Sequence, residues 1–218
     1  MASHFPHVLA MGDWDDATVQ LSNDQIHHLE RVLRLKPGEA VGYTDGKGTV
    51  GRGIYEGGQI ARDQEGTVPR PSPLTMAVPP PASRERCRFL VEKLAELGVA
   101  RLVWLSTRFG EGHVPHRTKA MSWAASALEQ SRGGWLMEIG ESLVAWEDLQ
   151  RPLVVAVPGG GSEVFEVMTV AIGPEGGLDP AEIPADAATI DLGLTILRVE
   201  TAAVVAATRF STPWHGGS

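Results

Sequence analysis

The chain has 218 residues, of which 43% are hydrophobic, and this composition is typical of a globular protein that buries a core. Its single cysteine, Cys87, excludes an internal disulfide framework. No apolar run is long enough to cross a bilayer and the first residues lack a signal-peptide pattern, so we expect a cytoplasmic protein that does not enter a membrane.

The net charge of −8 is unevenly distributed along the chain. Residues 84–132 carry 9 Lys and Arg against 5 Asp and Glu, whereas residues 133–218 carry 3 against 12. Affinity for nucleic acid depends on local neutralisation of phosphates and not on the charge of the whole chain. The basic region is therefore compatible with RNA binding, although it does not by itself predict it.

Residues 1–70 have the pattern of a small β-rich domain with one helix. Ser22 and Gln25 form a capping-box pattern, and apolar residues then recur at helical spacing until residues 36–38 end the helix. Strands are expected at residues 40–44 and 49–55, joined by a hairpin turn.

A domain boundary is expected near residue 71, where six prolines lie between residues 69 and 81. After this boundary, apolar strand patterns alternate with helical ones, which indicates an α/β domain with a parallel sheet and helices on both faces. The expected strands are residues 74–78, 101–105, 153–157, 167–172 and 189–192, and the expected helices are residues 86–97, 118–131, 179–182 and 199–209.

Glycine-rich turns follow three of these strands, at residues 158–161, 173–177 and 192–193. Ligands of parallel sheets bind at the carboxyl ends of the strands, where these turns are expected to lie. Taken alone, Gly173–Gly177 has the composition of an ordinary turn. In combination with a charged junction at residues 198–201, the turns indicate a cleft for a flat, adenine-bearing cofactor.

Three segments resemble the SPOUT-class methyltransferases that modify N3 of a uridine in 16S ribosomal RNA. They are Ile172–Gly177, Leu192-Gly193 and Ile196–Ala202. Three further parts of the chain are similar to other segments of that family, so the resemblance covers nearly the whole chain. They are residues 27–38 together with 45–48, residues 93–99, and residues 127–132. It implies a PUA-like, RNA-binding barrel in residues 1–70 and, in residues 71–218, a SPOUT domain with a trefoil knot that forms a homodimer.

The same resemblance implies S-adenosylmethionine as cofactor and 16S ribosomal RNA or the small ribosomal subunit as partner. Two of the implied cofactor-binding residues have other possible roles. Glu175 would contact a partner subunit or be solvated in a turn, and Thr201 would also cap the last helix. The implied cofactor-binding residues are Pro158, Ile172, Gly173, Glu175, Gly176, Leu192, Gly193, Leu197 and Thr201.

N3 of uracil carries a proton, so a base or a cation is expected to assist its methylation. The candidates are Arg198 and Glu200. Arg198 would pair with Glu200, contact a phosphate, stabilise the uracil anion, or form a structural salt bridge that stabilises the knot. Glu200 would act as the base or, as we favour, as the partner of Arg198.

For RNA binding, Arg31 and Arg34 are expected three apart on one helix, and Arg108 and Arg132 occupy positions that are basic in the resembled family. Cys87, Trp104 and Trp123 are expected in the core. The histidines lack ligand spacing with a cysteine, so no metal is expected.

The chain also departs from the family pattern. It begins Met1–Phe5 where an arginine is common, and residues 83–86 lack the usual lysine. Two alternative functions also stay open. One is an RNA- or ribosome-binding protein of the same fold without catalysis, and the other is a nucleotide-binding α/β enzyme that uses Gly173–Gly177 to bind an anion.

Overall fold

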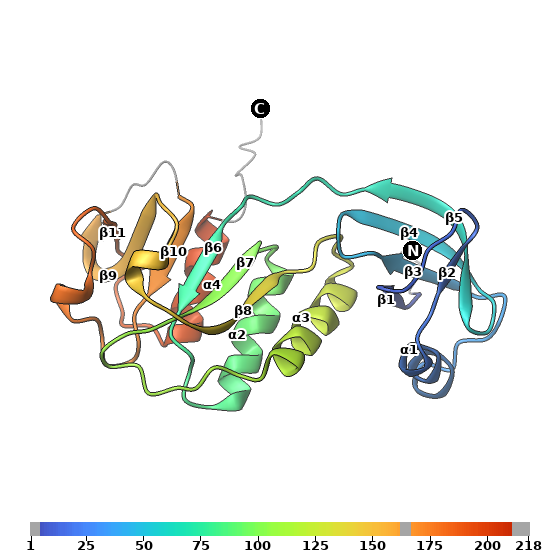
Figure 1. Cartoon of the computed structure of the whole chain (residues 1–218), viewed down its shortest axis with the longest axis horizontal. Coiled ribbons are helices and arrows are strands. Elements are labelled where there is room, and N and C mark those ends of the chain that lie inside the picture. Colours follow the sequence, from blue (N-terminus) through green and yellow to red (C-terminus); the bar gives the residue numbers. More distant parts are fainter. Residues whose placement is uncertain (1–4, 162–166, 211–218) are drawn as a thin grey trace. The chain divides into compact units, whose positions relative to one another are not determined.

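The computed structural model of the protein describes residues 5–161 and 167–210 (Figure 1). The chain divides into two compact units. The first is Met1–Arg70 together with Leu128–Leu136, and the second is Pro71–Ala127 together with Met137–Ser218. In the described ranges, no helix is long and apolar enough to cross a membrane.

The first unit is built on a curled five-stranded sheet with the order β1-β3-β4-β5-β2 (Figure 1). All neighbours are antiparallel except β1 and β3. The two strands predicted at residues 40–44 and 49–55 are confirmed with those bounds. The strands are β1 (His7–Leu9), β2 (Thr18–Gln20), β3 (Ala40–Thr44), β4 (Thr49–Tyr55) and β5 (Gln59–Thr67).

Helix α1 (Asn23–His27) begins at the predicted capping box, in which the Ser22 side chain accepts from the Gln25 N–H and the Gln25 side chain accepts from the Ser22 N–H. It continues as one π-helical turn, η1 (His28–Val32). Arg34 then adopts a left-handed conformation with φ of 58°. The helical segment is therefore shorter than predicted, because the chain turns before the proline.

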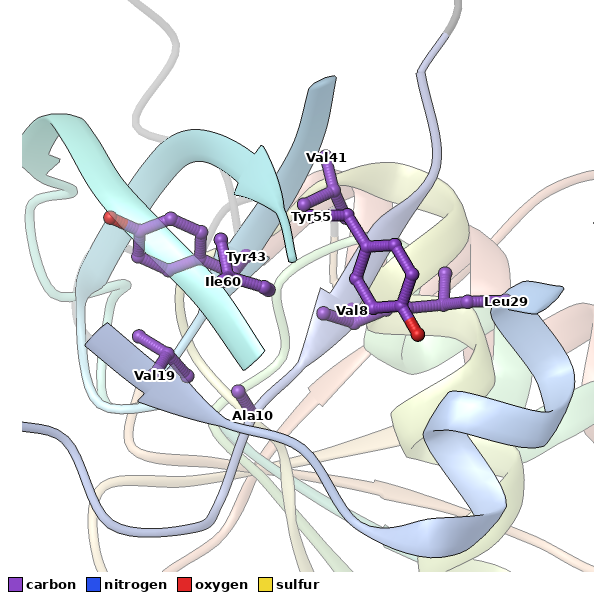
Figure 2. Close-up of a cluster of buried hydrophobic side chains, with 8 residues drawn as sticks. All are labelled: Val8, Ala10, Val19, Leu29, Val41, Tyr43, Tyr55 and Ile60. Carbon is purple, nitrogen blue, oxygen red and sulfur yellow. The ribbon is translucent and has the colours of Figure 1, made fainter. Parts of the chain in front are cut away.

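The core of this unit brings together eight buried side chains from the sheet and the helical segment (Figure 2). Tyr43 and Tyr55 are its largest members. Each keeps its hydroxyl group hydrogen-bonded, to Glu65 at 2.7 Å and to Glu30 at 2.7 Å respectively. Both rings can therefore fill the core without leaving a polar atom unpaired. The eight residues are Val8, Ala10, Val19, Leu29, Val41, Tyr43, Tyr55 and Ile60.

Residues 128–136 belong to this unit through hydrogen bonds that periodicity cannot predict. The Leu9 N–H donates to the Glu129 carboxylate at 2.9 Å, and the Trp135 indole donates to the Val68 carbonyl at 2.9 Å. Burial raises the pKa of the Glu129 carboxyl, although the Leu9 N–H opposes this shift.

The second unit contains a six-stranded, wholly parallel sheet with the order β11-β9-β10-β6-β7-β8. The predicted α/β class is confirmed by this sheet. Its strands are β6 (Thr75–Val78), β7 (Arg101–Leu105), β8 (Glu138–Val144), β9 (Leu153–Gly161), β10 (Thr169–Ile172) and β11 (Ala188–Ile190).

The α-helices after residue 70 are α2 (Arg84–Glu96), α3 (Arg117–Ser131) and α4 (Val199–Phe210). The residues of α3 from Leu128 onward belong to the first unit. Helix α2 starts at Ser83, whose hydroxyl accepts from the Arg86 N–H. Helices α2 and α4 lie side by side, and α4 also packs against β6 and β10. Cys87, Trp104 and Trp123 are buried, as predicted.

The expectation of helices on both faces of this sheet is only half correct. Successive side chains of a strand point to opposite faces, so Ala77, Val103 and Val155 share one face. Their cluster contains Trp146 from η2 (Trp146–Asp148), which is one turn of 3-10 helix. It also contains Ile183, which follows a second 3-10 turn, η3 (Pro180–Glu182). Among the described residues, no α-helix contributes to that cluster, because short connections after β8 and β10 cover the face.

Strand β9 also corrects an expectation. Residues 158–161, predicted as a turn, are part of the strand. Strand β9 therefore extends beyond the end of β10, because Ile172, the last residue of β10, pairs with Ala156. The extension pairs with β11 after a shift of register between Thr189 and Ile190. Glycine is needed at Gly160, where a Cβ would lie 2.6 Å from the carbonyl carbon of Ile190.

Candidate active site

The strand order of the parallel sheet reverses between β6 and β10, because β6 leads to β7 on one side while β10 lies on the other. Ligands of such sheets bind outside the carboxyl ends of the strands at this point. A cleft of about 580 Å³ opens there. Its walls are the segment after β6, the segment after β7 and the turn after β10, and Arg86 reaches it from α2.

Arg86 joins two carboxylates from distant parts of the chain. Its Nε lies 2.9 Å from Oε1 of Glu200 and its Nη2 lies 2.5 Å from Oε2 of Glu200. The same Nη2 also forms an ion pair with Glu175 in the turn after β10. Two parallel charge-assisted bonds between a guanidinium group and a carboxylate fix both side chains in one geometry.

The electrostatics of this group follow from its partners. The hydrogen bonds that Arg86 donates to Glu200 hold the pKa of Arg86 above its usual range despite burial. Burial alone would raise the pKa of the Glu200 carboxyl, but the hydrogen bonds from Arg86, a backbone hydrogen bond and the charges of Arg86 and Arg198 together lower it. Glu200 therefore stays ionised, and its two oxygens are occupied by Arg86.

The favoured pairing of Glu200 with Arg198 is thus wrong. Arg198 is exposed and lowers the pKa of Glu200 only through its charge. The true partner, Arg86, was missed although the sequence carried a signal. Arg86 lies four residues before Leu90 and eight before Leu94, so it extends the buried stripe of α2 and needs a partner there.

The strand ends predicted to hold the cofactor belong to three neighbouring strands, β11, β9 and β10. Pro158 lies in the extension of β9, Ile172 ends β10 and is buried, and Leu192 and Gly193 follow β11. The structure therefore brings these residues to one edge of the sheet.

Asp191 ties two of these strand ends together. Its carboxylate accepts from the Gly159 N–H at 2.7 Å and from the Gly193 N–H at 3.0 Å. These hydrogen bonds, that of Gly193 first, hold the pKa of Asp191 below its usual range. Asp191 was not among the predicted site residues, although Asp before Leu-Gly is typical of a turn closed by the aspartate side chain.

The remaining predicted cofactor residues lie in the turn after β10 and at the start of α4. Gly173 and Gly176 lie in that turn, where Glu175 is engaged with Arg86 and not simply solvated. Leu197 is half-buried just before α4. Thr201 lies inside the first turn of α4, which begins at Val199, so its predicted capping role is wrong.

The backbone at the β11–β9 edge is open with respect to the described residues. None of their heavy atoms lies within 4 Å of the position that a Cβ would take on Gly159 or Gly193. Gly193 has a φ of 147°, a conformation that side chains disfavour. Backbone that a ligand can approach without meeting a Cβ, beside the apolar Leu192 and Leu197, suits a nucleoside that has both flat apolar faces and polar edges.

The predicted RNA-binding arginines are all exposed. Arg31 and Arg34 do not share a helix, because Arg34 lies beyond η1 in the left-handed conformation. Arg108 pairs with Asp179. Arg132 donates to the Phe5 carbonyl at 3.0 Å, and its guanidinium carbon lies 4.7 Å from the centre of the Phe5 ring.

Arg52 reaches the same Phe5 ring, at 5.1 Å from its centre. No local pattern joins Phe5 with Arg52 and Arg132, because the three residues are far apart in the chain. No group of three or more His, Cys, Asp or Glu side chains in residues 5–161 and 167–210 is arranged to hold a metal ion.

Comparison with known proteins identifies the family. The sequence model of an RNA methyltransferase domain matches residues 68–211, and that of an RNA methyltransferase PUA domain matches residues 21–59. Among solved structures, ribosomal RNA small subunit methyltransferase E from Neisseria gonorrhoeae, bound to S-adenosylmethionine, has the same fold. The TM-score is 0.82 at 21% identity, covering 94% of this chain and 96% of that one.

Two curated relatives are similar over most of their length, and both are named ribosomal RNA small subunit methyltransferase E. The one from Synechocystis is 28% identical over 221 residues, covering 88% of this chain and 72% of that protein. The one from Mycobacterium bovis is 28% identical over 226 residues, covering 87% and 84%. The resemblance found in the sequence is thereby confirmed, and the chain belongs to the RNA methyltransferase domain family.

Proposed function

We propose that the protein transfers a methyl group from S-adenosylmethionine to N3 of a uridine in small-subunit (16S) ribosomal RNA. The observation that carries this proposal is the edge formed by β11, β9 and β10 in a chain of the RNA methyltransferase family. At that edge, the strand ends lie side by side with open backbone. The names of the curated relatives support the ribosomal substrate.

The cofactor would be held by the backbone and apolar edges of this region. Leu192, Gly193 and Leu197 would contact it from one side, Pro158 from β9, and Ile172, Gly173 and Gly176 from the turn after β10. Glu175 and Thr201 are proposed contacts for its polar groups. When bound, S-adenosylmethionine supplies a methyl group on a sulfonium sulfur, which keeps the electron pair of the bond that breaks.

The protein's own residues then act on the acceptor base. N3 becomes a good nucleophile only when its proton leaves, so the site needs an acceptor for that proton and a cation for the anion that forms. We propose that Glu200 works indirectly, by fixing the guanidinium of Arg86 at the cleft. Arg198, which is exposed, is proposed to contact an RNA phosphate or the uracil anion.

RNA binding is proposed for both parts of the chain. Residues 1–70 would form the PUA-like RNA-binding domain and residues 71–218 the methyltransferase domain, and the two family matches support this division. Arg31, Arg34, Arg108 and Arg132 are the proposed phosphate contacts. Because the net charge is −8, affinity would come from these local cations and would weaken with salt.

We further propose that the second unit is knotted and forms a homodimer in the cytoplasm. Leu194 and Ile196, in the segment before α4, expose nearly their whole side chains. Adjacent large apolar side chains that face solvent mark a surface that another molecule covers. A second copy of the chain is the proposed cover.

One experiment tests the substrate. The gene is deleted, the small-subunit RNA is digested, and its nucleosides are analysed by mass spectrometry. The proposal expects one uridine to lose its N3-methyl group and to regain it when the gene is restored. Persistence of every methylated uridine would refute the substrate assignment.

Calorimetry separates the alternatives. Binding of S-adenosylmethionine with a dissociation constant of roughly micromolar order supports a methyltransferase. RNA binding without any response to S-adenosylmethionine would indicate a non-catalytic relative of the same fold. A response to ATP alone would indicate a nucleotide-binding enzyme.

A further inference from the structure

The cleft at the switch point is separate from the edge assigned to the cofactor. The cleft lies at the ends of β6, β7 and β10, whereas the cofactor edge is formed by β11, β9 and β10. The turn after β10 belongs to both, since Glu175 and Gly176 line the cleft. A ligand in the cleft would therefore be a neighbour of the cofactor across one turn.

Phe109 gives this cleft an aromatic surface. The ring follows β7, lines the cleft and is 46% exposed. The guanidinium carbon of Arg108 lies 5.5 Å from the ring centre. A large aromatic side chain at a concave site, with a cation beside it, is the combination on which nucleic-acid bases stack.

The segment that carries Phe109 is fixed by its neighbours. The Arg108 N–H donates to the Glu182 carboxylate at 2.5 Å, and the Arg108 side chain pairs with Asp179. At the other end, a Cβ on Gly112 would overlap the carbonyl oxygen of Pro80. The backbone that carries the ring is therefore fixed before a ligand binds, which reduces the entropy lost on binding.

The polar groups of the cleft match the edge of uracil that carries N3. That edge presents an N–H donor between two carbonyl acceptors. Arg86 can only donate, and the Glu175 carboxylate, whose side chain is 48% exposed, can only accept. Enzymes that modify a base bring it out of its stack into such a pocket.

We propose that the cleft beside Phe109 receives the target uracil, which stacks on the Phe109 ring while Arg86 donates to a uracil carbonyl and Glu175 accepts the N3 proton. This inference rests on the proposed function and names the acceptor site of the same reaction. The cleft volume of about 580 Å³ lies within the range of small-molecule sites and accommodates a nucleoside.

The first test is a crosslink. Small-subunit RNA is prepared with 4-thiouridine at the uridine identified by the deletion experiment, bound to the full protein and irradiated. The reactive sulfur lies next to N3, so the proposal expects mass spectrometry to find the crosslink in residues 108–112 or 174–176. Crosslinks confined to other segments would overturn the proposed pocket.

The second test uses substitutions of matched exposure. Phe109→Ala is expected to lower kcat/KM for the RNA by about 5- to 150-fold, which is the fold-change that corresponds to base–aromatic stacking. Phe109→Tyr keeps the ring and is expected to retain most of the activity. Phe89→Ala removes a ring that is 44% exposed on α2 outside the cleft, and it serves as the control.

Calorimetry with S-adenosylmethionine completes the design. The proposal expects an unchanged dissociation constant in Phe109→Ala, because the ring faces the acceptor and not the cofactor. Equal kcat/KM values for Phe109→Ala and Phe89→Ala would overturn it. If the unmodified protein methylates no RNA, the proposed function itself fails, and this outcome is distinct from failure of the pocket alone.

Discussion

Arg86 and Glu200 are 114 residues apart in the chain and meet in a two-point ion pair, with Nε–Oε1 at 2.9 Å and Nη2–Oε2 at 2.5 Å. The pair joins α2 to the start of α4, and the same guanidinium reaches Glu175 in the turn after β10. Through Arg86, helix α2 is therefore connected to two segments of the region proposed to bind the cofactor, the turn after β10 and the start of α4.

Glu200→Gln is therefore expected to lower both stability and turnover. It removes the charge of a buried carboxylate and leaves Arg86 partly unpaired, so the free energy of unfolding should fall by roughly 1–3 kcal/mol. Thermal unfolding measures this change. Steady-state kinetics should show a lower kcat with little change in KM for S-adenosylmethionine. The reason is that Glu200 is proposed to position Arg86 toward the uracil and not toward the cofactor.

Arg88→Ala is the matched control for Glu200→Gln, because it breaks an exposed ion pair with Glu92 on the same helix α2. An exposed pair of this kind contributes about 0–1 kcal/mol. If both variants lose the same small amount of stability and keep full turnover, the role assigned to the Arg86–Glu200 pair is wrong.

Asp191→Ala is expected to weaken the binding of S-adenosylmethionine by about 10-fold, or ~1.4 kcal/mol. The substitution removes the acceptor that joins the Gly159 and Gly193 N–H groups, so the two strand ends lose their common anchor. Isothermal calorimetry measures the dissociation constant. Asp186→Ala, which removes an exposed partner of Arg151, is the control. Equal affinities of the two variants would contradict the anchoring role.

His7 predicts a pH dependence of stability. Burial first, and the charge of Arg132 second, lower the pKa of the His7 imidazole to about 4, whereas the unfolded chain titrates near pH 6.5. Between these values, the unfolded chain binds a proton that the folded chain does not. Stability should therefore be unaffected above pH 6.5 and fall as the pH drops towards 4, by up to about 1.4 kcal/mol per pH unit.

His7→Gln tests this dependence, because glutamine does not titrate. Denaturant unfolding at a series of pH values should give a flatter profile for the variant than for the unmodified protein in that window. Parallel profiles would mean that His7 is not the group responsible.

The proposed dimer predicts that Leu194→Asp combined with Ile196→Asp yields a monomer. Both side chains are almost fully exposed in one copy, and burying a carboxylate in an apolar interface is costly. Sedimentation velocity measures the mass. Leu143→Asp, at an apolar residue that is 50% exposed on β8, should leave the dimer intact. A monomeric unmodified protein would contradict the proposal.

Much of the fold could be predicted because burial leaves a regular trace in the sequence. Strand β7 is buried on both faces and reads as a continuous apolar run, and α2 has a clear apolar stripe. Strands β5 and β8 were missed, because many of their side chains are exposed and no apolar alternation marks them. Strand β1 was too short, with three residues, to show any period.

The site was predicted less completely, for a geometric reason. Glycine turns after strands are local patterns, so the turns after β10 and β11 could be identified in advance, whereas residues 158–161 are part of β9. The partner of Glu200 could not, because ion pairing depends on packing between segments 114 residues apart. Arg198 was a poor choice, since residues two apart at the start of a helix do not face each other.

Reconstitution shows whether the protein methylates N3 of a uridine in small-subunit RNA. Small ribosomal subunits from the deletion strain are incubated with the purified protein and S-adenosylmethionine labelled in its methyl group, and the RNA nucleosides are separated by mass. We expect label in 3-methyluridine at one position. Label in another nucleoside, or none in the RNA while S-adenosylmethionine binds normally, would contradict it.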